Sequence, residues 1–197
     1  MKSIIDHYDR LIDEGNDPVF DSEPLREYMN KWDGQDFIDK MHLDDAKTVL
    51  EIGVGTGRLA IKVAKQCKSF LGIDISPKTV ERARHNLPFN NINIVCDDFI
   101  GHRFDKKFDI IYSSLTFMHI DDKAFAVKKI ASLLNTNGRF LLSIDKNQDD
   151  FIDMGSRRIK VYPDSPEEIK KLIVLSDLKI EEIYETEFAH IFVARKN

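Results

Sequence analysis

Three glycines, Gly53, Gly55 and Gly57, stand between an apolar run and a helix-like segment. Glycine turns between a strand and a helix let a nucleotide or a phosphate lie against the backbone. A dinucleotide fingerprint, G-x-G-x-x-G, needs a further glycine where this sequence has Arg58. Glu51 precedes the glycines, and its negative charge would repel a pyrophosphate but suits a ligand that carries a cation. The turn therefore indicates a cofactor other than a dinucleotide.

Further acidic residues end the next two strand-like runs. Asp74 follows the glycine turn at about the 20-residue interval at which an acid accepts both hydrogen bonds of a ribose diol. Asp97 and Asp98 end the third run, where a carboxylate can accept a hydrogen bond from an exocyclic amine such as that of adenine. Ile75 or Phe99 can pack on the ring. The pattern predicts a nucleoside site, and leaves open which of the paired aspartates faces the amine.

Composition excludes several classes of protein. The 197 residues are 42% hydrophobic and 32% charged, as expected for one soluble globular domain. No apolar stretch approaches the roughly 20 residues that cross a bilayer, and the acidic N-terminal segment does not resemble a secretory signal. The net charge of −5 and the scattered basic doublets give no reason to expect a nucleic-acid partner. Cys67 and Cys96 are interpreted as reduced thiols of a cytoplasmic protein.

Alternating strand-like and helix-like segments must position these residues. This alternation is typical of a doubly wound α/β domain with a mostly parallel sheet. After the last crossover helix, two strand-like runs lie too close together for another helix, which predicts an antiparallel hairpin at one sheet edge. Strands are expected at 48–53, 69–75, 91–98, 107–115, 138–145, 179–187 and 190–196, and helices at 58–67, 76–87, 122–134 and 165–177.

The chain is interpreted as a single domain, residues 1–197, with four parts. Residues 1–46 contain several aromatic residues, and we expect them to form a helical cap over the carboxyl ends of the strands. Residues 47–145 form the cofactor-binding core, residues 146–164 an insertion on the substrate side, and residues 165–197 the final helix and hairpin.

Five stretches of the sequence resemble motifs of one enzyme family. They are "VLEIGVGTGRLA" (49–60), "GIDIS" (72–76), "VCDDF" (95–99), "FDIIYSSLTFMHI" (108–120) and "IASLLNTNGRFLLSID" (130–145). Together they are similar to class I S-adenosylmethionine-dependent methyltransferases, and to small bacterial ones that act on small molecules. The resemblance covers about residues 45–197 and implies a Rossmann-like fold. The last stretch departs from the L-x-P-G-G form of the family at Thr136-Asn137-Gly138.

The resemblance implies a role for each matching residue. S-adenosylmethionine would be the cofactor, with its methionine part over the three glycines and Glu51 fixing the turn or the ammonium group. Asp74 would hold the ribose, and Asp98 or Asp97 would face adenine. Ser113 and Ser114 would line the wall beside the sulfonium, or serve only as small residues at a strand end. Tyr8 resembles a lid residue over the cofactor.

His119 is the candidate general base, because imidazole titrates near neutrality and can take a proton from a hydroxyl or an amine. The alternative is a histidine that packs beside Phe117 and Met118 or orients the next helix. Arg157 and Arg158 in the insertion are candidates to bind an anionic substrate. The alternative is that both lie in a solvated loop. The carboxylates of residues 144–150 are interpreted as solvated, and no metal is expected.

These observations favour methyl transfer to a small-molecule acceptor, with no nucleic acid and no membrane involved. A non-catalytic cofactor-binding module of the same fold, acting as a sensor or a subunit, is the main alternative. A nicotinamide-dependent reductase is a third, although it would need the glycine that Arg58 replaces. The sequence identifies neither the acceptor nor the oligomeric state.

Overall fold

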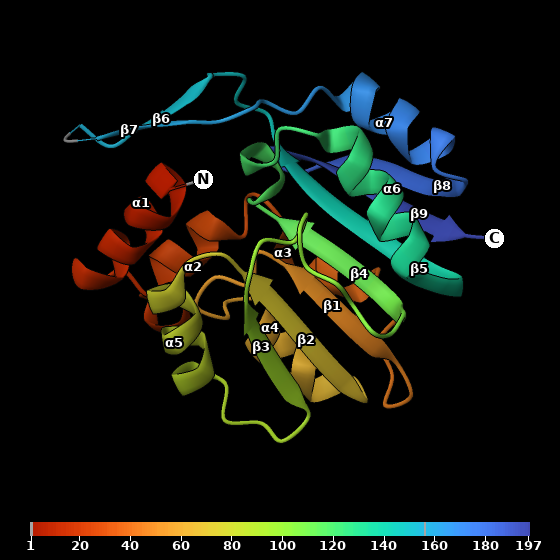
Figure 1. Cartoon of the computed structure of the whole chain (residues 1–197), viewed down its shortest axis with the longest axis horizontal. Helices are drawn as coiled ribbons and strands as arrows, with labels where there is room; N and C mark the ends of the chain where they lie inside the picture. The colour runs from red at the N-terminus through yellow and green to blue at the C-terminus, as the bar shows by residue number, and fades with distance from the viewer. Residues whose placement is uncertain (1, 156) are drawn as a thin grey trace.

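A seven-stranded β-sheet forms the centre of the molecule (Figure 1). The computed structural model describes residues 2–155 and 157–197, so Met1 and Ser156 lie outside the described part of the chain. Across the sheet the strands follow the order β3-β2-β1-β4-β5-β9-β8. Their bounds are β1 Thr48–Ile52, β2 Ser69–Asp74, β3 Ile92–Cys96, β4 Phe108–Ser114, β5 Leu134–Asp145, β8 Leu178–Glu185 and β9 Ala189–Lys196.

The sheet is parallel from β3 to β5 and antiparallel at the other end. β9 pairs antiparallel with β5, and β8 pairs antiparallel with β9 at the edge. The chain moves outward from β1 through β2 to β3 and then places β4 on the other side of β1. The reversal between β1 and β4 opens a crevice at the carboxyl ends of these strands, where such sheets bind ligands. The predicted α/β fold and its C-terminal hairpin are confirmed.

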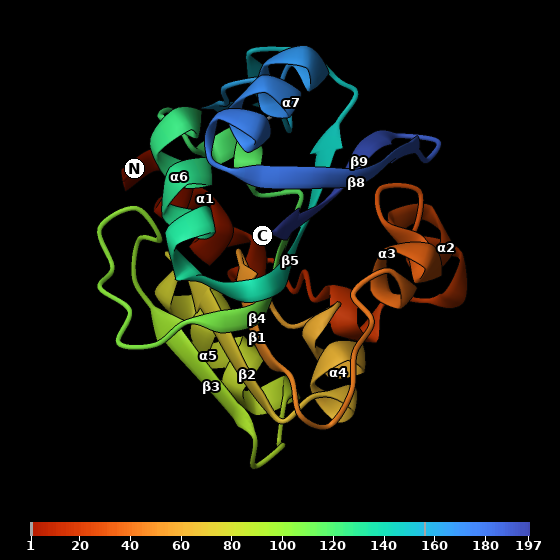
Figure 2. The ribbon, with the colours of Figure 1, turned by 90° about the vertical axis from the view of Figure 1, so that its right-hand side faces the viewer.

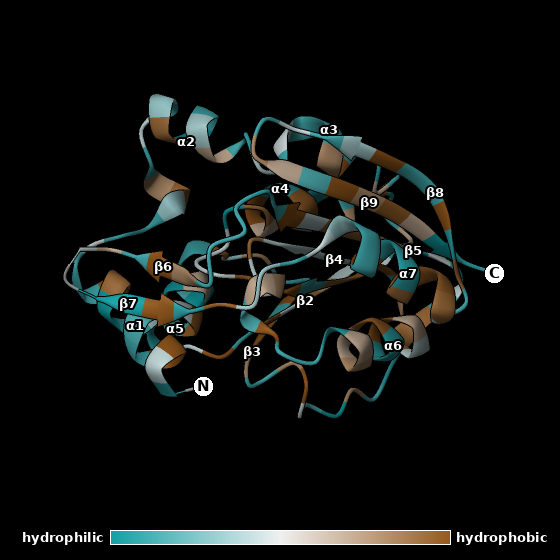
Figure 3. Cartoon of the chain, turned by 90° about the horizontal axis from the view of Figure 1, so that it is seen from above, coloured by the Kyte–Doolittle hydropathy of each residue, from teal (hydrophilic) through white to brown (hydrophobic). Residues whose placement is uncertain are grey.

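Helices cover both faces of the sheet (Figure 2). Val49 and Leu50 of β1 are both fully buried, each in a different hydrophobic core. Apolar strands of this kind are expected where helices shield both faces, and the apolar stretches of β2 and β9 are visible in Figure 3. One face is covered by α3 (Gly34–Asp39), α4 (Ala60–Val63) and α5 (Pro77–Asn86), and the other by α6 (Lys123–Leu133) and α7 (Pro166–Leu175). Within residues 2–155 and 157–197 no helix has the length and apolar character needed to span a membrane.

Two predicted boundaries differ from the structure. The helix expected at 58–67 is a single turn, α4, followed by the 3-10 helix η2 (Ala64–Gln66), after which the chain turns into β2. The strand expected to begin at Gly138 begins at Leu134, which pairs with Phe108. A register shift between β4 and β5 and the left-handed backbone of Asn137 (φ 63°) let the strand pass through Asn137 and Gly138.

The N-terminal cap and the insertion lie above the crevice. The cap contains α1 (Lys2–Asp13), the 3-10 helix η1 (Pro18–Phe20), α2 (Glu23–Met29) and α3. The insertion, residues 146–164, is called the strap below. It forms an antiparallel pair, β6 (Phe151–Asp153) and β7 (Arg158–Lys160), which passes across the end of α1 in Figure 1. α1 therefore forms the roof of the crevice, and the strap packs against α1.

Candidate functional site

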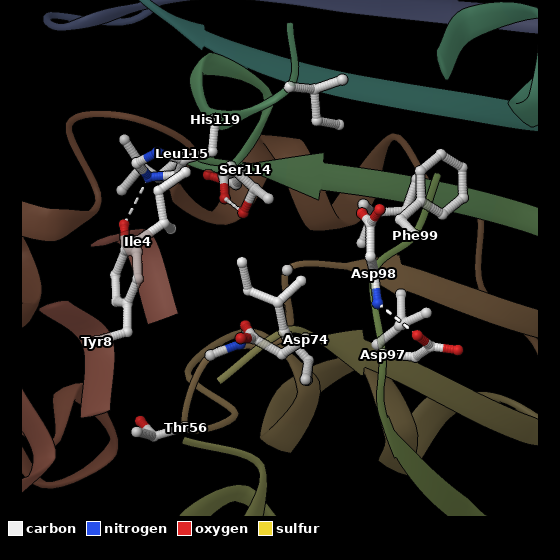
Figure 4. A pocket seen from close by; sticks show the side chains of 18 of the residues that line it. Ile4, Tyr8, Thr56, Asp74, Asp97, Asp98, Phe99, Ser114, Leu115 and His119 are labelled. Atoms are coloured by element: carbon white, nitrogen blue, oxygen red, sulfur yellow. Dashed lines mark hydrogen bonds between the residues drawn. The ribbon is translucent and has the colours of Figure 1, made fainter. Parts of the chain in front are cut away.

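A cavity of about 290 Å³ lies at the carboxyl ends of the central strands. Its walls come from the ends of β3, β2, β1 and β4, in the order in which these strands lie in the sheet, and from α1 in the roof. Figure 4 shows the same order, with Asp97, Asp98 and Phe99 at one end, Asp74 between, and Tyr8 and His119 at the other. The sheet thus arranges the predicted residues along one line.

The glycine turn brings bare backbone to the floor of the cavity. Gly53 has φ 77°, and a β-carbon there would lie 1.9 Å from Oγ1 of Thr116, so only glycine fits. Gly55 has φ 55°, and a β-carbon there would meet no atom within 4 Å. The turn therefore has both features expected where a ligand approaches backbone, a left-handed conformation that glycine adopts without strain and open space above it.

The carboxylate of Asp74 lies between the glycine turn and the start of α5. Its Oδ2 accepts a hydrogen bond from the amide of Gly55 at 3.0 Å, and its Oδ1 accepts one from the amide of Ser76 at 3.0 Å. Burial raises the pKa of Asp74, and hydrogen bonds from the amides of Ser76, Gly55 and Ile75 oppose that shift. Asp74 and Ile75 both line the cavity. Asp74 can thus brace the turn and face a ligand.

The paired aspartates after β3 have different surroundings. Asp97 is exposed, and its carboxylate bonds Nδ1 of His102 at 2.8 Å, which lowers the pKa of Asp97. Oδ1 of Asp98 accepts a hydrogen bond from the amide of Ile100 at 3.1 Å. Phe99 is buried and lies in the cavity wall. Because both carboxylates line the cavity, either one can face an exocyclic amine.

Ser113 and Ser114 end β4 but point to different partners. The hydroxyl of Ser113 is fully buried and donates to the carbonyl of Ile52 at 3.0 Å, away from the cavity wall. The hydroxyl of Ser114 donates to Oδ2 of Asp33 at 2.8 Å, and Ser114 lines the cavity. Of the two serines, only Ser114 is in place to contact a ligand there.

Glu51 lies below the glycine turn, outside the cavity wall. Its side chain is buried and accepts a hydrogen bond from the Tyr112 hydroxyl at 2.8 Å. Burial raises the pKa of Glu51 to about 8, although this hydrogen bond and the charge of Arg58 favour the ionised form. Glu51 is therefore largely protonated at neutral pH, which favours the predicted role in fixing the turn over the role as a counter-ion for an ammonium group.

Glu51→Gln is expected to change how stability depends on pH. The pKa of Glu51 is about 8 in the folded chain, whereas the usual value of 4.5 applies to the unfolded chain. Between these two pH values the folded state therefore binds more protons than the unfolded state. The contribution of Glu51 is then fully present below about pH 4.5 and falls as pH rises towards about 8, with a slope of at most about 1.4 kcal/mol per unit. Urea unfolding at several pH values should show this decline in the wild type and a flatter profile in the variant. Parallel profiles would contradict the assignment.

A buried ion pair, Asp33 with Arg58, joins the cap to the glycine turn. Oδ1 of Asp33 accepts from Nη1 of Arg58 at 3.1 Å, and Nη2 of Arg58 donates to Oδ2. Oδ1 of Asp33 also accepts from the amide of Gly34, and its Oδ2 accepts from Ser114. Burial alone would lower the pKa of Arg58, but the hydrogen bonds and charge of Asp33 raise it. Sequence reasoning missed Asp33, because nothing in the sequence links it to Arg58.

Tyr8 and His119 meet in the roof of the cavity. The Tyr8 hydroxyl is hydrogen-bonded to Nε2 of His119 at 2.7 Å, and both residues line the cavity (Figure 4). Burial lowers the pKa of His119 to about 4 and raises that of Tyr8, so both side chains are neutral near pH 7. The structure thus brings the predicted lid residue and the predicted base into direct contact.

Residues 50–142 match a family model described as a methyltransferase domain. The chain therefore contains a methyltransferase domain, which has the fold of the class I S-adenosylmethionine-dependent methyltransferases. The match begins in β1 and ends in β5, so it contains every strand end that lines the cavity. The predicted methyltransferase domain is confirmed.

Sequence relatives and solved structures similar to this chain include methyltransferases with different names. A malonyl-[acyl-carrier protein] O-methyltransferase of Ilyobacter polytropus is 36% identical over 104 residues, which cover 51% of this chain and 38% of the relative. A ubiquinone biosynthesis O-methyltransferase of Neisseria meningitidis is 28% identical over 154 residues, 73% of this chain and 64% of the relative. The chain thus spans less than two thirds of the length of these relatives. The N-methyltransferase NodS of Bradyrhizobium japonicum, solved with S-adenosyl-L-homocysteine, shares the fold with a TM-score of 0.70 at 16% identity, over 98% of this chain and 97% of NodS.

The cavity fits the family cofactor, S-adenosylmethionine. The space above Gly55 is open, so a ligand can lie there against the backbone, and a β-carbon would occupy that space. Asp74 lies beside it and accepts a hydrogen bond from the Gly55 amide. Among the described lining residues the formal charges are three aspartates and Arg58. An acidic lining suits a ligand that carries both a sulfonium and an ammonium group.

The strap of the methyltransferase is clasped to α1. Arg157 donates from Nη1 and Nη2 to the two carboxylate oxygens of Glu14, at 2.7 and 2.8 Å, and from Nε to Nδ1 of His7 at 2.9 Å. Its neighbour Arg158 stacks on Phe151, 4.3 Å from the ring centre, within the strap. Of the two predicted anion-binding arginines, Arg157 is therefore engaged in holding the roof together.

Arg157→Gln is expected to loosen the strap without changing the rest of the fold. The clasp is an ion pair near the surface, so the melting temperature should change little, while local opening of the strap should increase. Limited proteolysis should cut residues 146–164 faster in the variant than in the wild type. Arg158→Gln, which leaves the Glu14 contact intact, is the matched control and should be cut at the wild-type rate. Equal rates for Arg157→Gln and the wild type would contradict the clasp.

Proposed function

We propose that the chain transfers a methyl group from S-adenosylmethionine to a small-molecule acceptor. One observation carries this proposal: the carboxylates after β3, Asp74 at the end of β2 and the glycine turn after β1 line a single cavity in the order adenine, ribose, methionine. The far end of that cavity, where the methyl group would be presented, is closed by Ser114, Tyr8 and His119.

The residues at this end provide alignment and exclude water. The bound cofactor supplies an electrophilic methyl group, so the protein mainly has to position an acceptor in line with it. Ile4, Leu115 and Ile120 add apolar wall to the cavity and limit the access of water to the reacting centre. Leu115 has φ 55°, a left-handed backbone that is uncommon outside glycine and is often found at functional sites.

His119 is proposed as the group that accepts a proton when the acceptor carries one. Its Nε2 is bonded to the Tyr8 hydroxyl, so a proton from the acceptor would reach His119 through that hydroxyl. The low pKa of His119 keeps its imidazole unprotonated near neutrality, as a base requires, and also makes it a weak base. This combination suits an acceptor whose proton is lost easily. The alternative role of His119 is to orient the Tyr8 hydroxyl.

The proposal of a small acceptor rests on the roof and on the charge. α1 and the strap are clasped together over the crevice, which favours a ligand that enters an enclosed site over a macromolecule that docks on an open surface. The net charge of −5 gives no support to a nucleic-acid acceptor. The relatives are named for different acceptors, so they do not identify the one used here.

Turnover separates an enzyme from a cofactor-binding module of the same fold. The purified chain is incubated with S-adenosylmethionine and each of a set of small phenols, amines, thiols and carboxylates, and release of S-adenosylhomocysteine is measured. The proposal predicts release that depends on at least one acceptor and is lost in Tyr8→Phe/His119→Ala. Binding of S-adenosylhomocysteine without turnover on any acceptor would favour the sensor or subunit role.

A further inference from the structure

A second cavity, of about 410 Å³, lies between the strap and the carboxyl end of β5, and it is called the strap pocket below. Its walls come from the 3-10 helix η3 (Phe117–His119), from Asp145 at the end of β5 and from the strap. The cofactor cavity is lined by the ends of β3, β2, β1 and β4, and β5 is the next strand in that row. Met118 lines the strap pocket and His119 lines the cofactor cavity, so the two cavities adjoin where the methyl group would be presented.

The strap pocket is acidic and otherwise mostly apolar. Its described lining contains four aspartates, Asp145, Asp149, Asp153 and Asp164, and no lysine, arginine or histidine. Most of the other lining residues are apolar, and they include a phenylalanine, a methionine and a valine. Within the described chain, no three metal-binding side chains gather closely enough to hold a metal ion. The lining therefore suits an organic cation with a carbon skeleton.

Asp164 places a buried carboxylate in the wall of the strap pocket. Only 2% of its side chain is exposed, and Nζ of Lys123 lies 2.8 Å from its Oδ1. Lys123 also donates to the carbonyls of Phe117 and Tyr162, at 2.6 and 2.9 Å, so its donors are shared among three groups. No described residue donates a hydrogen bond to Oδ2 of Asp164. Because a buried carboxylate oxygen without a donor is costly, an ammonium group placed there would be stabilised.

Asp145 is oriented but has no counter-ion within the described chain. Its Oδ2 accepts a hydrogen bond from Nε1 of Trp32 at 2.9 Å, and its Oδ1 accepts one from the amide of Asn147 at 2.7 Å. Both donors are uncharged, and each carboxylate oxygen can accept a further hydrogen bond. Burial raises the pKa of Asp164, Lys123 opposes this shift, and the charge of Asp145 adds to it. The two carboxylates therefore repel each other, and a cation between them would relieve that repulsion.

We propose that the strap pocket binds an ammonium group of the methyl acceptor, with Asp145 as its main counter-ion and Asp164 as the second. This assignment rests on the proposed function, since it names the chemical class of its acceptor: a small molecule that carries a cationic amine in addition to its nucleophile. An ammonium group enclosed in a cavity needs a charged partner with hydrogen-bond acceptors, which a carboxylate provides. The carbon skeleton of the acceptor packs on the apolar lining, and its nucleophile extends past Met118 towards His119.

The positive side chains of the strap agree with a cationic ligand. Arg158 lies 3.6 Å from Asp153, but both side chains are more than half exposed, so this ion pair is at the surface. Arg157 is engaged by Glu14 and His7 of α1. The described lining of the strap pocket contains neither arginine, whereas it does contain aspartates of the strap. This arrangement is the opposite of the one that an anionic substrate needs.

The test uses three ligands of similar shape that differ in one terminal group. Tyramine, tyrosol and 4-hydroxyphenylacetate each have a phenol, and they end in an ammonium, a hydroxyl and a carboxylate group respectively. Each is titrated by isothermal calorimetry, near neutral pH, into the chain saturated with S-adenosylhomocysteine. Tyramine should bind roughly tenfold more tightly than tyrosol or better, and 4-hydroxyphenylacetate should bind most weakly.

Asp145→Asn removes the main counter-ion and keeps the shape of the side chain. The ratio of the tyramine and tyrosol affinities should fall about fivefold, while the affinities for tyrosol and for S-adenosylhomocysteine stay nearly unchanged. Asp105→Asn removes an exposed carboxylate outside the lining of the strap pocket, so it is the charge-matched control and should keep the wild-type ratio. A wild-type ratio in Asp145→Asn would contradict the assignment.

The outcomes separate this assignment from the proposed function. Equal affinities for tyramine and tyrosol, or no binding of tyramine, would overturn the cation site, while binding of S-adenosylhomocysteine would still support the cofactor site. A chain that prefers tyramine but does not bind S-adenosylhomocysteine would contradict the proposed function and support the cation site. If Asp145→Asn does not fold, the ligand ratio of the wild type and its decrease in Asp149→Asn, which removes an exposed carboxylate of the lining, decide the question.

Discussion

Asp33→Ala is expected to lower the free energy of unfolding by about 3–5 kcal/mol. The substitution leaves the guanidinium of Arg58, which is mostly buried, without its counter-ion. It also removes the acceptor of the Ser114 hydroxyl and of the Gly34 amide. A buried charge that has lost its partner costs far more than the same pair contributes when both members are removed together. Urea unfolding followed by circular dichroism measures this loss.

Two further variants show whether the loss comes from the orphaned charge. Asp33→Asn keeps the shape of the side chain and one oxygen acceptor, so it should cost less than Asp33→Ala. Asp33→Ala/Arg58→Met removes both charges and should regain a large part of the loss caused by Asp33→Ala. Additive losses in the double variant, or a loss below about 1 kcal/mol for Asp33→Ala, would contradict a buried ion pair that holds the cap to the glycine turn.

Asp74→Ala is expected to weaken cofactor binding roughly tenfold or more and to destabilise the fold as well. The carboxylate faces the cavity, so its loss removes hydrogen-bond acceptors for the ribose. The same carboxylate accepts from the amides of Gly55 and Ser76, and leaving these N–H groups without an acceptor costs about 1–3 kcal/mol. Calorimetry with S-adenosylhomocysteine and thermal unfolding measure the two effects separately.

Asp74→Asn separates binding from stability. The amide oxygen can still accept from one of the backbone N–H groups, so the melting temperature should stay closer to that of the wild type than in Asp74→Ala. Binding should remain weak, because the amide has one acceptor oxygen in place of the two of the carboxylate, and its NH2 group cannot accept a hydrogen bond from the ribose diol. An Asp74→Ala variant that binds S-adenosylhomocysteine normally would contradict the ribose assignment, whatever its stability.

The framework of the site could be predicted because it depends on local patterns. Gly53, Gly55, Asp74 and Asp98 each lie at or just after the end of a strand, and the carboxyl ends of adjacent parallel strands meet at one edge of the sheet. The order of apolar and amphipathic segments was enough to predict that these residues lie in one cavity. Ser113 shows the limit of this reasoning, since its hydroxyl bonds Ile52 while its neighbour Ser114 reaches the cavity wall.

The contacts that close the site could not be predicted, because they join segments far apart in the chain. Asp33 and Arg58 are separated by 25 positions, Tyr8 and His119 by 111, and Glu14 and Arg157 by 143. No periodicity or spacing in the sequence encodes such pairs. They depend on how the cap and the strap pack on the sheet. This packing also brings Arg157, a candidate anion-binding residue, into contact with Glu14 of α1.

Calorimetric titration of the wild-type chain with S-adenosylhomocysteine, and in parallel with NADH, tests the cofactor assignment most directly. The site described above predicts saturable one-to-one binding of S-adenosylhomocysteine and no heat of binding for NADH, because the turn has Arg58 where a dinucleotide fingerprint has glycine. Binding of NADH with none of S-adenosylhomocysteine would contradict the account.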